Sequence, residues 1–236
     1  MTQRRRGERL ARGFSLRTTN LKTADDRTLP VIDGSAHIPM SRVELAALYQ
    51  RIRYAHTDER GLVLEVIGAH PGAGVTSIAN GIGHAAAELD AQRVLLCDAT
   101  EDSGQLQHRK LAPIGSPQLV SIPHATVPYG VSACRLDPRY GQSEMPGIPG
   151  YAEALNRLRM LFDLIVIDAP PGNMSALGPR LSRHADAVLV VVEAEKTRRP
   201  LITGLLRSIT DNGGKVAGVV LNKRVQHIPD RIYRWL

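Results

Sequence analysis

One stretch of this chain has the residue types of a loop that binds phosphate. Residues 69–76 read Ala-His-Pro-Gly-Ala-Gly-Val-Thr, with an apolar run before them and a helix-forming run after them. Gly72 and Gly74 allow a tight turn whose backbone N–H groups point inward, and the start of the following helix adds partial positive charge. Thr76 stands where a loop hydroxyl would ligate Mg²⁺. The pattern predicts a site for ATP or ADP with Mg²⁺; the alternative is a tight turn without a ligand.

The expected contacts of the nucleotide are six loop residues and one residue that ends a later strand: Gly72, Ala73, Gly74, Val75, Thr76, Ser77 and Asn222. Val75 stands where loops of this kind carry a lysine. A lysine there neutralises the terminal phosphates and the charge that develops during transfer, which a hydrocarbon side chain cannot do. His70 is no obvious replacement, because an imidazole is largely neutral near pH 7. We therefore expect a backbone cradle without its catalytic cation, and nucleotide binding that is weak or absent.

Polar side chains stand at the ends of three apolar runs that are expected to be strands. Asp98, Asp168 and Asn222 each follow one of these runs. Because the carboxyl ends of parallel strands meet at one edge of a sheet, the two carboxylates are expected beside the loop. There they would hold Mg²⁺ together with Thr76 and, in an active enzyme, orient the attacking hydroxyl. The Asn222 amide offers a donor and an acceptor to a nucleotide base. Taken singly, each of the three also fits a cap or a turn.

Apolar runs alternate with helix-forming runs from residue 62 onward. The expected strands are 62–67, 93–97, 119–122, 164–167, 187–192 and 216–221, and the expected helices are 40–56, 76–89, 151–161, 177–183 and 200–210. Fully apolar strands that alternate with helices are typical of a parallel sheet covered on both faces. We predict an α/β fold with a mostly parallel sheet and helices on both faces over residues 37–222. A flexible basic arm (1–36) precedes it and a basic, aromatic tail (223–236) follows it.

The composition indicates a globular protein with basic ends. Of the 236 residues, 43% are hydrophobic, and no apolar run approaches the ~18 residues of a membrane span. Residues 1–29 carry +5 and residues 223–236 carry +3, whereas the residues between them carry −1. A near-neutral body does not predict a nucleic-acid-binding face. The ends are either solvated tails or contacts for anionic lipid, an acidic partner or nucleic acid. Two cysteines in unrelated contexts suggest a reducing compartment, so we expect a cytoplasmic protein.

The ordered motifs together resemble the bacterial tyrosine autokinases of capsule and exopolysaccharide synthesis, which are relatives of the MinD/ParA ATPases. The resemblance rests on residues 71–77 with Asn80, 94–98, 162–171, 185–197 and 218–222. It covers about residues 40–236, and the ordered set is more specific than any single motif. The resemblance implies the three-layer P-loop NTPase fold.

Three departures from that family weaken the same activity. Val75 replaces the lysine, Thr100 replaces a second Asp, and the tail has only Tyr233 where the kinases have a cluster of tyrosines phosphorylated in trans. We therefore expect a degenerate, kinase-like protein whose task is interaction. The resemblance implies docking on a membrane-anchored polysaccharide co-polymerase, the chain-length regulator. Nucleic acid is not an expected partner, contact with the inner membrane face is peripheral, and a homo-oligomer is possible.

Two other functions remain open. An active tyrosine autokinase needs a cation from elsewhere, such as Lys223, Arg224 or a neighbouring subunit, and would carry phosphate on Tyr233. A positioning ATPase of the MinD/ParA type would use the basic ends on membrane or DNA, and the missing lysine weakens it equally. The tail, which holds Trp235, either covers its own domain or contacts a membrane-proximal partner.

Overall fold

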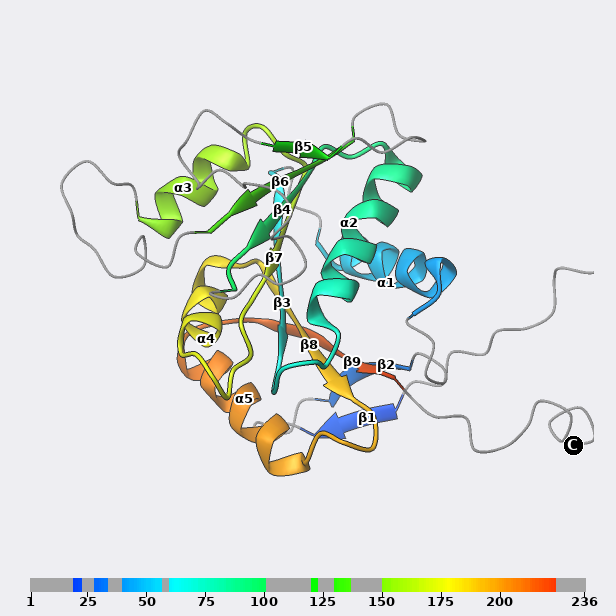
Figure 1. The fold of residues 1–236 in the computed structure, drawn as a ribbon, viewed down its shortest axis with the longest axis vertical. Coiled ribbons are helices and arrows are strands. Elements are labelled where there is room, and N and C mark those ends of the chain that lie inside the picture. The colour runs from blue at the N-terminus through cyan, green and yellow to red at the C-terminus, as the bar shows by residue number, and fades with distance from the viewer. Residues whose placement is uncertain are drawn as a thin grey trace, which may run out of the picture.

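The computed structural model describes residues 19–22, 28–33, 40–56, 60–100, 120–122, 130–136 and 150–223. The strands are β1 (Thr19–Lys22), β2 (Thr28–Asp33), β3 (Leu62–Gly68), β4 (Val94–Asp98), β5 (Val120–Ile122), β6 (Val131–Arg135), β7 (Leu164–Asp168), β8 (Ala187–Glu193) and β9 (Val216–Asn222). The helices are α1 (Arg42–Ala55), α2 (Val75–Asp90), α3 (Tyr151–Leu158), α4 (Leu177–Leu181), the 3₁₀ helix η2 (Ser182–His184) and α5 (Arg199–Asp211). All the described strands belong to one sheet (Figure 1).

The sheet has the order β1-β2-β9-β8-β3-β7-β4-β6-β5. Neighbouring strands from β2 to β6 in this order run parallel, and the edge strands β1 and β5 run antiparallel to their neighbours. The predicted α/β fold with a mostly parallel sheet is confirmed. Because β3 lies at the centre, the loop that follows it opens at the middle of the edge where the parallel strands end.

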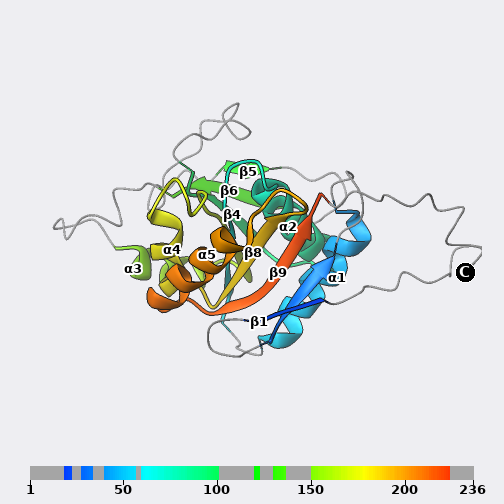
Figure 2. The same cartoon turned by 90° about the horizontal axis from the view of Figure 1, so that it is seen from below.

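Helices cover both faces of the sheet. α1 and α2 lie on one face, and α3, α4 and α5 lie on the other (Figures 1 and 2). Alternate residues of β3 point to opposite faces, as the period of a strand requires. Leu64 and Val66 belong to the apolar cluster under α1 and α2, and Val63 and Ile67 belong to the cluster under α3, α4 and α5. The first of these clusters packs α2, and with it the end of the loop, against the sheet.

Before residue 37, where a flexible arm was expected, the structure contains two strands. β2 pairs in parallel with β9, and β1 pairs with β2. The other residues of the expected arm lie outside the described residues. Neither strand is a continuous apolar run: β1 reads Thr-Asn-Leu-Lys, and Pro30 interrupts the apolar residues of β2. β6, which lies in a stretch dense in Pro and Gly, was also not predicted. The strand expected in the same stretch near 119–122 is confirmed as β5.

The two cysteines occupy adjacent strands, although their sequence contexts are unrelated. Cys97 of β4 and Cys134 of β6 are register partners, and their Sγ atoms are 3.4 Å apart. Both thiols are buried and free. The contact with Cys134, together with burial, raises the pKa of Cys97 well above its usual range. A thiol that stays protonated reacts poorly, so Cys97 packs as a small apolar side chain against Cys134.

Glu65 is a carboxyl group inside the central strand. Its side chain is fully buried between Val63 and Ile67 on the face that α3, α4 and α5 cover, and neither carboxyl oxygen has a hydrogen-bond partner. Burial raises the pKa of Glu65 well above its usual range. An unpaired charge at this depth is costly, so the fold favours the protonated form.

Replacing Glu65 with methionine, which has a similar length and no charge, is expected to stabilise the protein. The pKa of Glu65 is higher in the folded chain than in the unfolded chain, where it is about 4.3. Raising the pH above that unfolded value therefore lowers wild-type stability, by up to about 1.4 kcal/mol per pH unit, until the folded pKa is passed. The stability gained by Glu65→Met should thus be larger at pH 8 than at pH 5, and about 1–3 kcal/mol at pH 8.

Urea unfolding at the two pH values measures this difference. Glu153→Met is the control, because Glu153 is an exposed residue of α3 whose ion pair with Arg157 lies in solvent. Its effect should be small and change little between the two pH values. A Glu65→Met gain that is the same at pH 5 and pH 8 would show that the carboxyl group is not the cause.

Candidate functional site

The loop between β3 and α2 has the tight backbone that the glycine spacing predicts. Gly72 and Gly74 have φ angles of 79° and 97°, which L side chains rarely adopt. A Cβ atom on Gly74 would lie 2.1 Å from Nδ2 of Asn222, so glycine is required there for steric reasons as well. At Gly72 an added Cβ would meet no atom within 4 Å, and that side of the loop is open. The glycines therefore fold the loop and leave one side accessible.

Two later segments brace the loop. The buried Asn222 amide donates from Nδ2 to the carbonyl of Ala73 over 2.8 Å, and the Gly172 N–H donates to the carbonyl of Gly68 over 2.9 Å. The described contact of Asn222 is thus with the loop backbone, and its contact with a base stays a prediction. The end of β9 and the turn after β7 fix the loop at both of its ends.

The start of α2 has the features of an anion site. Gly74 is the N-cap, no side chain caps the helix, and its first turn contains no acidic residue. The first N–H groups of a helix have no partner within the helix and carry partial positive charge. Ser77 of this turn is exposed and Thr76 is half-buried. This geometry fits a phosphate group against the loop and the first turn of α2.

The two predicted carboxylates come together under that helix start. Asp98 and Asp168 are register partners on β4 and β7, and they follow Leu96 and Val166 on the face that α2 covers. One oxygen of Asp98, Oδ1, accepts from the N–H of Thr100 at 2.9 Å and from its hydroxyl at 2.6 Å. Thr100 stands where the kinase pattern has a second acid, and here it fixes the side chain of Asp98.

Each carboxylate keeps one buried oxygen without a hydrogen-bond partner, Oδ2 of Asp98 and Oδ1 of Asp168. Burial raises the pKa of Asp168 to about 7, a hydrogen bond with Thr76 acts in the opposite direction, and the charge of Asp98 adds to the increase. Orphaned carboxylate oxygens beside a threonine hydroxyl suit Mg²⁺, which binds one or two protein carboxylates and completes its shell with phosphate and water. Thr76, Asp98 and Asp168 therefore fit the predicted metal site.

Val75 does not fit the terminal phosphates. Its side chain is 9% exposed and belongs to the apolar cluster under α1 and α2. It packs over the end of β3, where a Cβ on Gly68 would lie 2.8 Å from Cγ2 of Val75. A valine here contributes to the core and supplies no positive charge. The loop retains a backbone cradle and, at this position, lacks a cation.

A polar cluster of His70, Thr197, Glu193 and Lys223 lies beside the loop. His70 Nδ1 donates to the carbonyl of Pro71 over 2.8 Å, so its Nε2 accepts from the Thr197 hydroxyl, also over 2.8 Å. The N–H of Glu193 donates to Thr197 Oγ1 over 3.0 Å. Lys223 Nζ donates to the carbonyl of Gly72 and lies 3.6 Å from Oε1 of Glu193. The sequence analysis did not predict a role for Glu193 or Thr197. Glu193 could have been found, because it ends an apolar strand as Asp98 does.

A cavity of about 370 Å³ connects this cluster with the start of α2. Its polar wall contains Gly74, Ser77, Glu193, Asn222 and Lys223, and Met40, Leu45 and Ile78 form its apolar wall. The volume is within the usual range for small-molecule sites. Of the predicted contacts, Gly74, Ser77 and Asn222 line this cavity.

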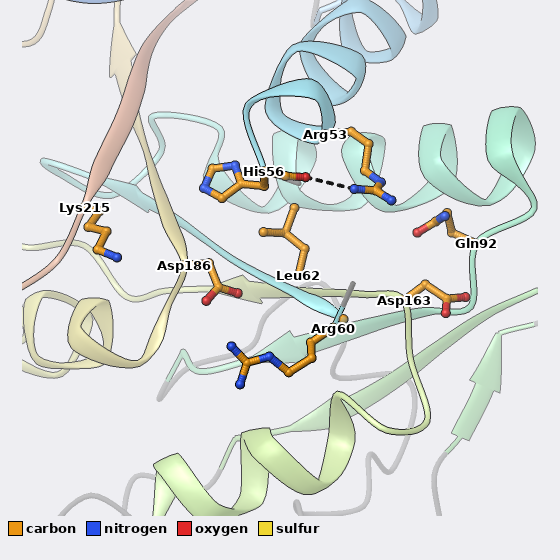
Figure 3. Close-up of a pocket in the computed structure, with 9 residues that line it drawn as sticks. Arg53, His56, Arg60, Leu62, Gln92, Asp163, Asp186 and Lys215 are labelled. Carbon is orange, nitrogen blue, oxygen red and sulfur yellow. Dashed lines mark hydrogen bonds between the residues drawn. The ribbon is translucent and has the colours of Figure 1, made fainter. Parts of the chain in front are cut away.

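A second cavity, of about 300 Å³, lies at the opposite edge of the sheet, where the strands begin (Figure 3). Arg53, Arg60 and Lys215 surround it, together with Asp163 and Asp186. Both acids have structural partners: Asp186 accepts from Arg159 at 2.6 and 2.9 Å, and Asp163 accepts from Arg93 at 2.6 and 3.0 Å. None of the residues predicted for chemistry lines this cavity, so the candidate site is at the phosphate loop.

Comparison with known proteins supports the resemblance. A Staphylococcus aureus protein named putative tyrosine-protein kinase CapB is 35% identical over 81 residues, which is 34% of this chain and 36% of that protein. The chain therefore matches about a third of the length of this relative. No family model matches the chain. Among the described residues, no helix is long and apolar enough to cross a bilayer.

Solved structures extend the likeness to most of the chain. The kinase domain of the Escherichia coli tyrosine kinase ETK superposes with a TM-score of 0.67 and 18% identity, covering 80% of this chain and 78% of that domain. The fold is that of bacterial tyrosine kinase domains. The BceF tyrosine kinase domain gives 0.64 with 20% identity, over 79% of this chain and 78% of its own. The chimerical protein CapA2B2 also gives 0.64 with 20% identity, over 80% of this chain and 87% of its own. The predicted resemblance to bacterial tyrosine kinases is confirmed.

Mg²⁺ is expected to stabilise this protein more at pH 8 than at pH 6. The pKa of Asp168 is about 7, so its carboxylate is mostly ionised at pH 8 and mostly protonated at pH 6, and a protonated acid is a poor ligand. At a Mg²⁺ concentration tenfold above Kd, the stabilisation is about 1.4 kcal/mol, which raises Tm by about 3–6 °C.

Thermal unfolding with and without Mg²⁺ at the two pH values measures this effect. In Asp168→Asn the Mg²⁺-dependent shift should disappear at both pH values. Asp211→Asn, which alters an exposed residue at the end of α5, should behave like the wild type. A shift that is independent of pH, or that persists in Asp168→Asn, would exclude Asp168 as a ligand.

Proposed function

We propose that this protein is a catalytically degenerate, kinase-like P-loop protein that acts with a membrane chain-length regulator in the synthesis and export of capsule or exopolysaccharide. The kinase-like fold comes from the comparisons above. The degeneracy is inferred from Val75, whose hydrocarbon side chain is packed in the core where a catalytic cation is needed. This observation carries the proposal, because Mg²⁺ ligands alone leave the transferred phosphoryl group without its main compensating charge.

ATP or ADP with Mg²⁺ is the ligand that the site suits, in a structural or switching role. The uncapped start of α2 suits phosphate, and Asp98, Asp168 and Thr76 suit the metal. Gly72, Ala73, Gly74, Thr76 and Ser77 are the proposed loop contacts. Without a lysine in the loop, we expect weak affinity and little or no turnover.

The proposed partner is a membrane-anchored polysaccharide co-polymerase, by analogy with the kinases whose fold this chain shares. Binding to such a partner would place the protein at the inner face of the membrane. The basic tail, residues 223–236, is a candidate contact with this partner. Apart from Lys223, it lies outside the described residues.

Changing Val75 to lysine tests the degeneracy. Val75→Lys is expected to bind Mg-ATP at least tenfold more tightly than the wild type, because a charge-assisted hydrogen bond to phosphate contributes about 1.5–3 kcal/mol. Val75→Met, which adds chain length without charge, is the matched control and should not gain affinity. Isothermal calorimetry with Mg-ATP and Mg-ADP provides the readout, and an assay of phosphate release accompanies it. Wild-type turnover that is lost in Asp98→Ala or Asp168→Ala would refute the degeneracy.

Affinity capture tests the partner. The tagged chain, incubated with detergent-solubilised membranes from its source organism, should enrich a polysaccharide co-polymerase, measured by quantitative mass spectrometry. Because the proposed interaction does not need turnover, Asp168→Asn should capture the same protein in a similar amount. Recovery of no polysaccharide-assembly component, from membranes shown to contain the co-polymerase, would contradict this part of the proposal.

An active tyrosine autokinase is the second candidate, and one observation favours it. The ammonium group of Lys223 contacts the loop at Gly72, as an alternative source of positive charge requires. Arg224, the other candidate in the chain, lies outside the described residues. This function predicts phosphate on Tyr233 after incubation with labelled ATP, and its absence would leave the degenerate interpretation.

A further inference from the structure

Lys223 is held at the phosphate loop by the end of β9. Its Nζ donates to the carbonyl of Gly72 and lies 3.6 Å from Oε1 of Glu193. The side chain is 40% exposed, so the ammonium group reaches the loop without losing contact with solvent. It also lines the 370 Å³ cavity together with Gly74 and Ser77 of the helix start. A lysine that is distant in sequence thus lies where the loop lacks its own.

The backbone at Lys223 is in an uncommon conformation. Its φ angle is 56°, in the left-handed region, where glycine is the usual residue and lysine is strained. The preceding residue, Asn222, is buried and tied to the loop at Ala73, so the turn begins from a fixed point. Strain of this kind is often kept at functional sites, and here it accompanies a side chain directed to the loop.

Three separate features point to an anionic, metal-bearing ligand at this place. Oδ1 of Asp168 and Oδ2 of Asp98 are buried without hydrogen-bond partners on the same edge of the sheet. The start of α2 has no side-chain cap. Gly72 has open space on its Cα side, next to the carbonyl that Lys223 contacts. A ligand with terminal phosphates and a bound divalent cation would satisfy all three.

We propose that Lys223 is the cation with which this site binds the terminal phosphates of a nucleotide, replacing the side chain at position 75 from the opposite side of the loop. The proposal rests on the nucleotide site of the proposed function. On binding, the ammonium group exchanges the Gly72 carbonyl and the Glu193 carboxylate for phosphate oxygens. An ammonium group is a compact charge on a flexible stem, so this exchange needs only side-chain rotation.

Glu193 opposes the ligand in this arrangement. Its carboxylate attracts Lys223 when the site is empty and faces a phosphate of the same sign when the site is filled. Removing the Glu193 charge should therefore free Lys223 and favour binding. If the pair of Lys223 and Glu193 were only a brace for the loop, removing either charge would loosen the loop and weaken binding. The two variants thus separate a binding role from a structural role by the sign of the effect.

Isothermal calorimetry of Mg-ATP into the 236-residue chain and four variants tests the proposal. Lys223→Met should weaken binding about 10- to 100-fold, the usual range for a charge-assisted hydrogen bond. Glu193→Gln should tighten it. Lys196→Met is the matched control: Lys196 Nζ lies 3.3 Å from Oε2 of Glu193 and its side chain is 65% exposed, and its loss should change affinity less than about twofold. Val75→Lys combined with Lys223→Met should recover the lost affinity.

Lys223→Gly separates stability from binding. Glycine relieves the left-handed backbone, so the Tm of this variant should be equal to or higher than that of the wild type, while Mg-ATP affinity falls as in Lys223→Met. Unchanged affinity in Lys223→Met, equal losses in Lys223→Met and Lys196→Met, or weaker binding in Glu193→Gln would each overturn the role of Lys223. A wild-type chain that does not bind Mg-ATP at all would also overturn it, yet would leave capture of the co-polymerase unaffected.

Discussion

Two desolvated carboxylates at the end of a parallel sheet set the electrostatics of this molecule. Asp98 and Asp168 are adjacent in register, nearly buried, and each keeps an oxygen that no protein group satisfies. Burial leaves these groups poorly solvated, and the charge of Asp98 adds a smaller repulsion, which is why the pKa of Asp168 rises to about 7. Thr100 satisfies one oxygen of Asp98, and the positive end of α2 lies over the pair. The edge is stable as folded, but a bound divalent cation would complete it.

The loop between β3 and α2 differs from this edge, because groups of the protein itself contact it on several sides. Asn222 and Gly172 fix its two ends, Val75 packs into the core, and Lys223 contacts its outer carbonyl. In a loop of this kind that has its own lysine, one residue both follows the glycine turn and supplies the positive charge for the phosphates. In the proposed arrangement these tasks are divided between Val75 and Lys223. The contacts that fold the loop then do not depend on the residue that binds the phosphates.

The long apolar strands and the glycine loop could be predicted from sequence because their signals are local. The strand ending at Asp168 is a continuous apolar run, and the turn at Gly74 needs a conformation that glycine favours. β2 was missed because Pro30 interrupts its apolar residues, and its place beside β9 depends on long-range pairing. The contact of Cys97 with Cys134 likewise follows from strand order. Asp98 and Asp168 could be placed at one edge, and Thr100 lies only two residues from the Asp98 that it contacts, whereas the contact of Glu193 with Lys223 follows from three-dimensional placement.

Competition within the cluster beside the loop bears on how tightly the site can bind. An ammonium group that already contacts a carbonyl and a carboxylate must leave both before it reaches a phosphate, and the half-buried Glu193 carboxylate then remains without that partner. A lysine within the loop has no such pair to break. If Lys223 binds the phosphates as proposed, part of the attraction gained there is offset by the loss of the pair with Glu193, and we expect a net affinity below that of a loop with its own lysine. The proposed weak binding and the proposed cation from β9 would then have the same physical origin, the Glu193 carboxylate that pairs with Lys223.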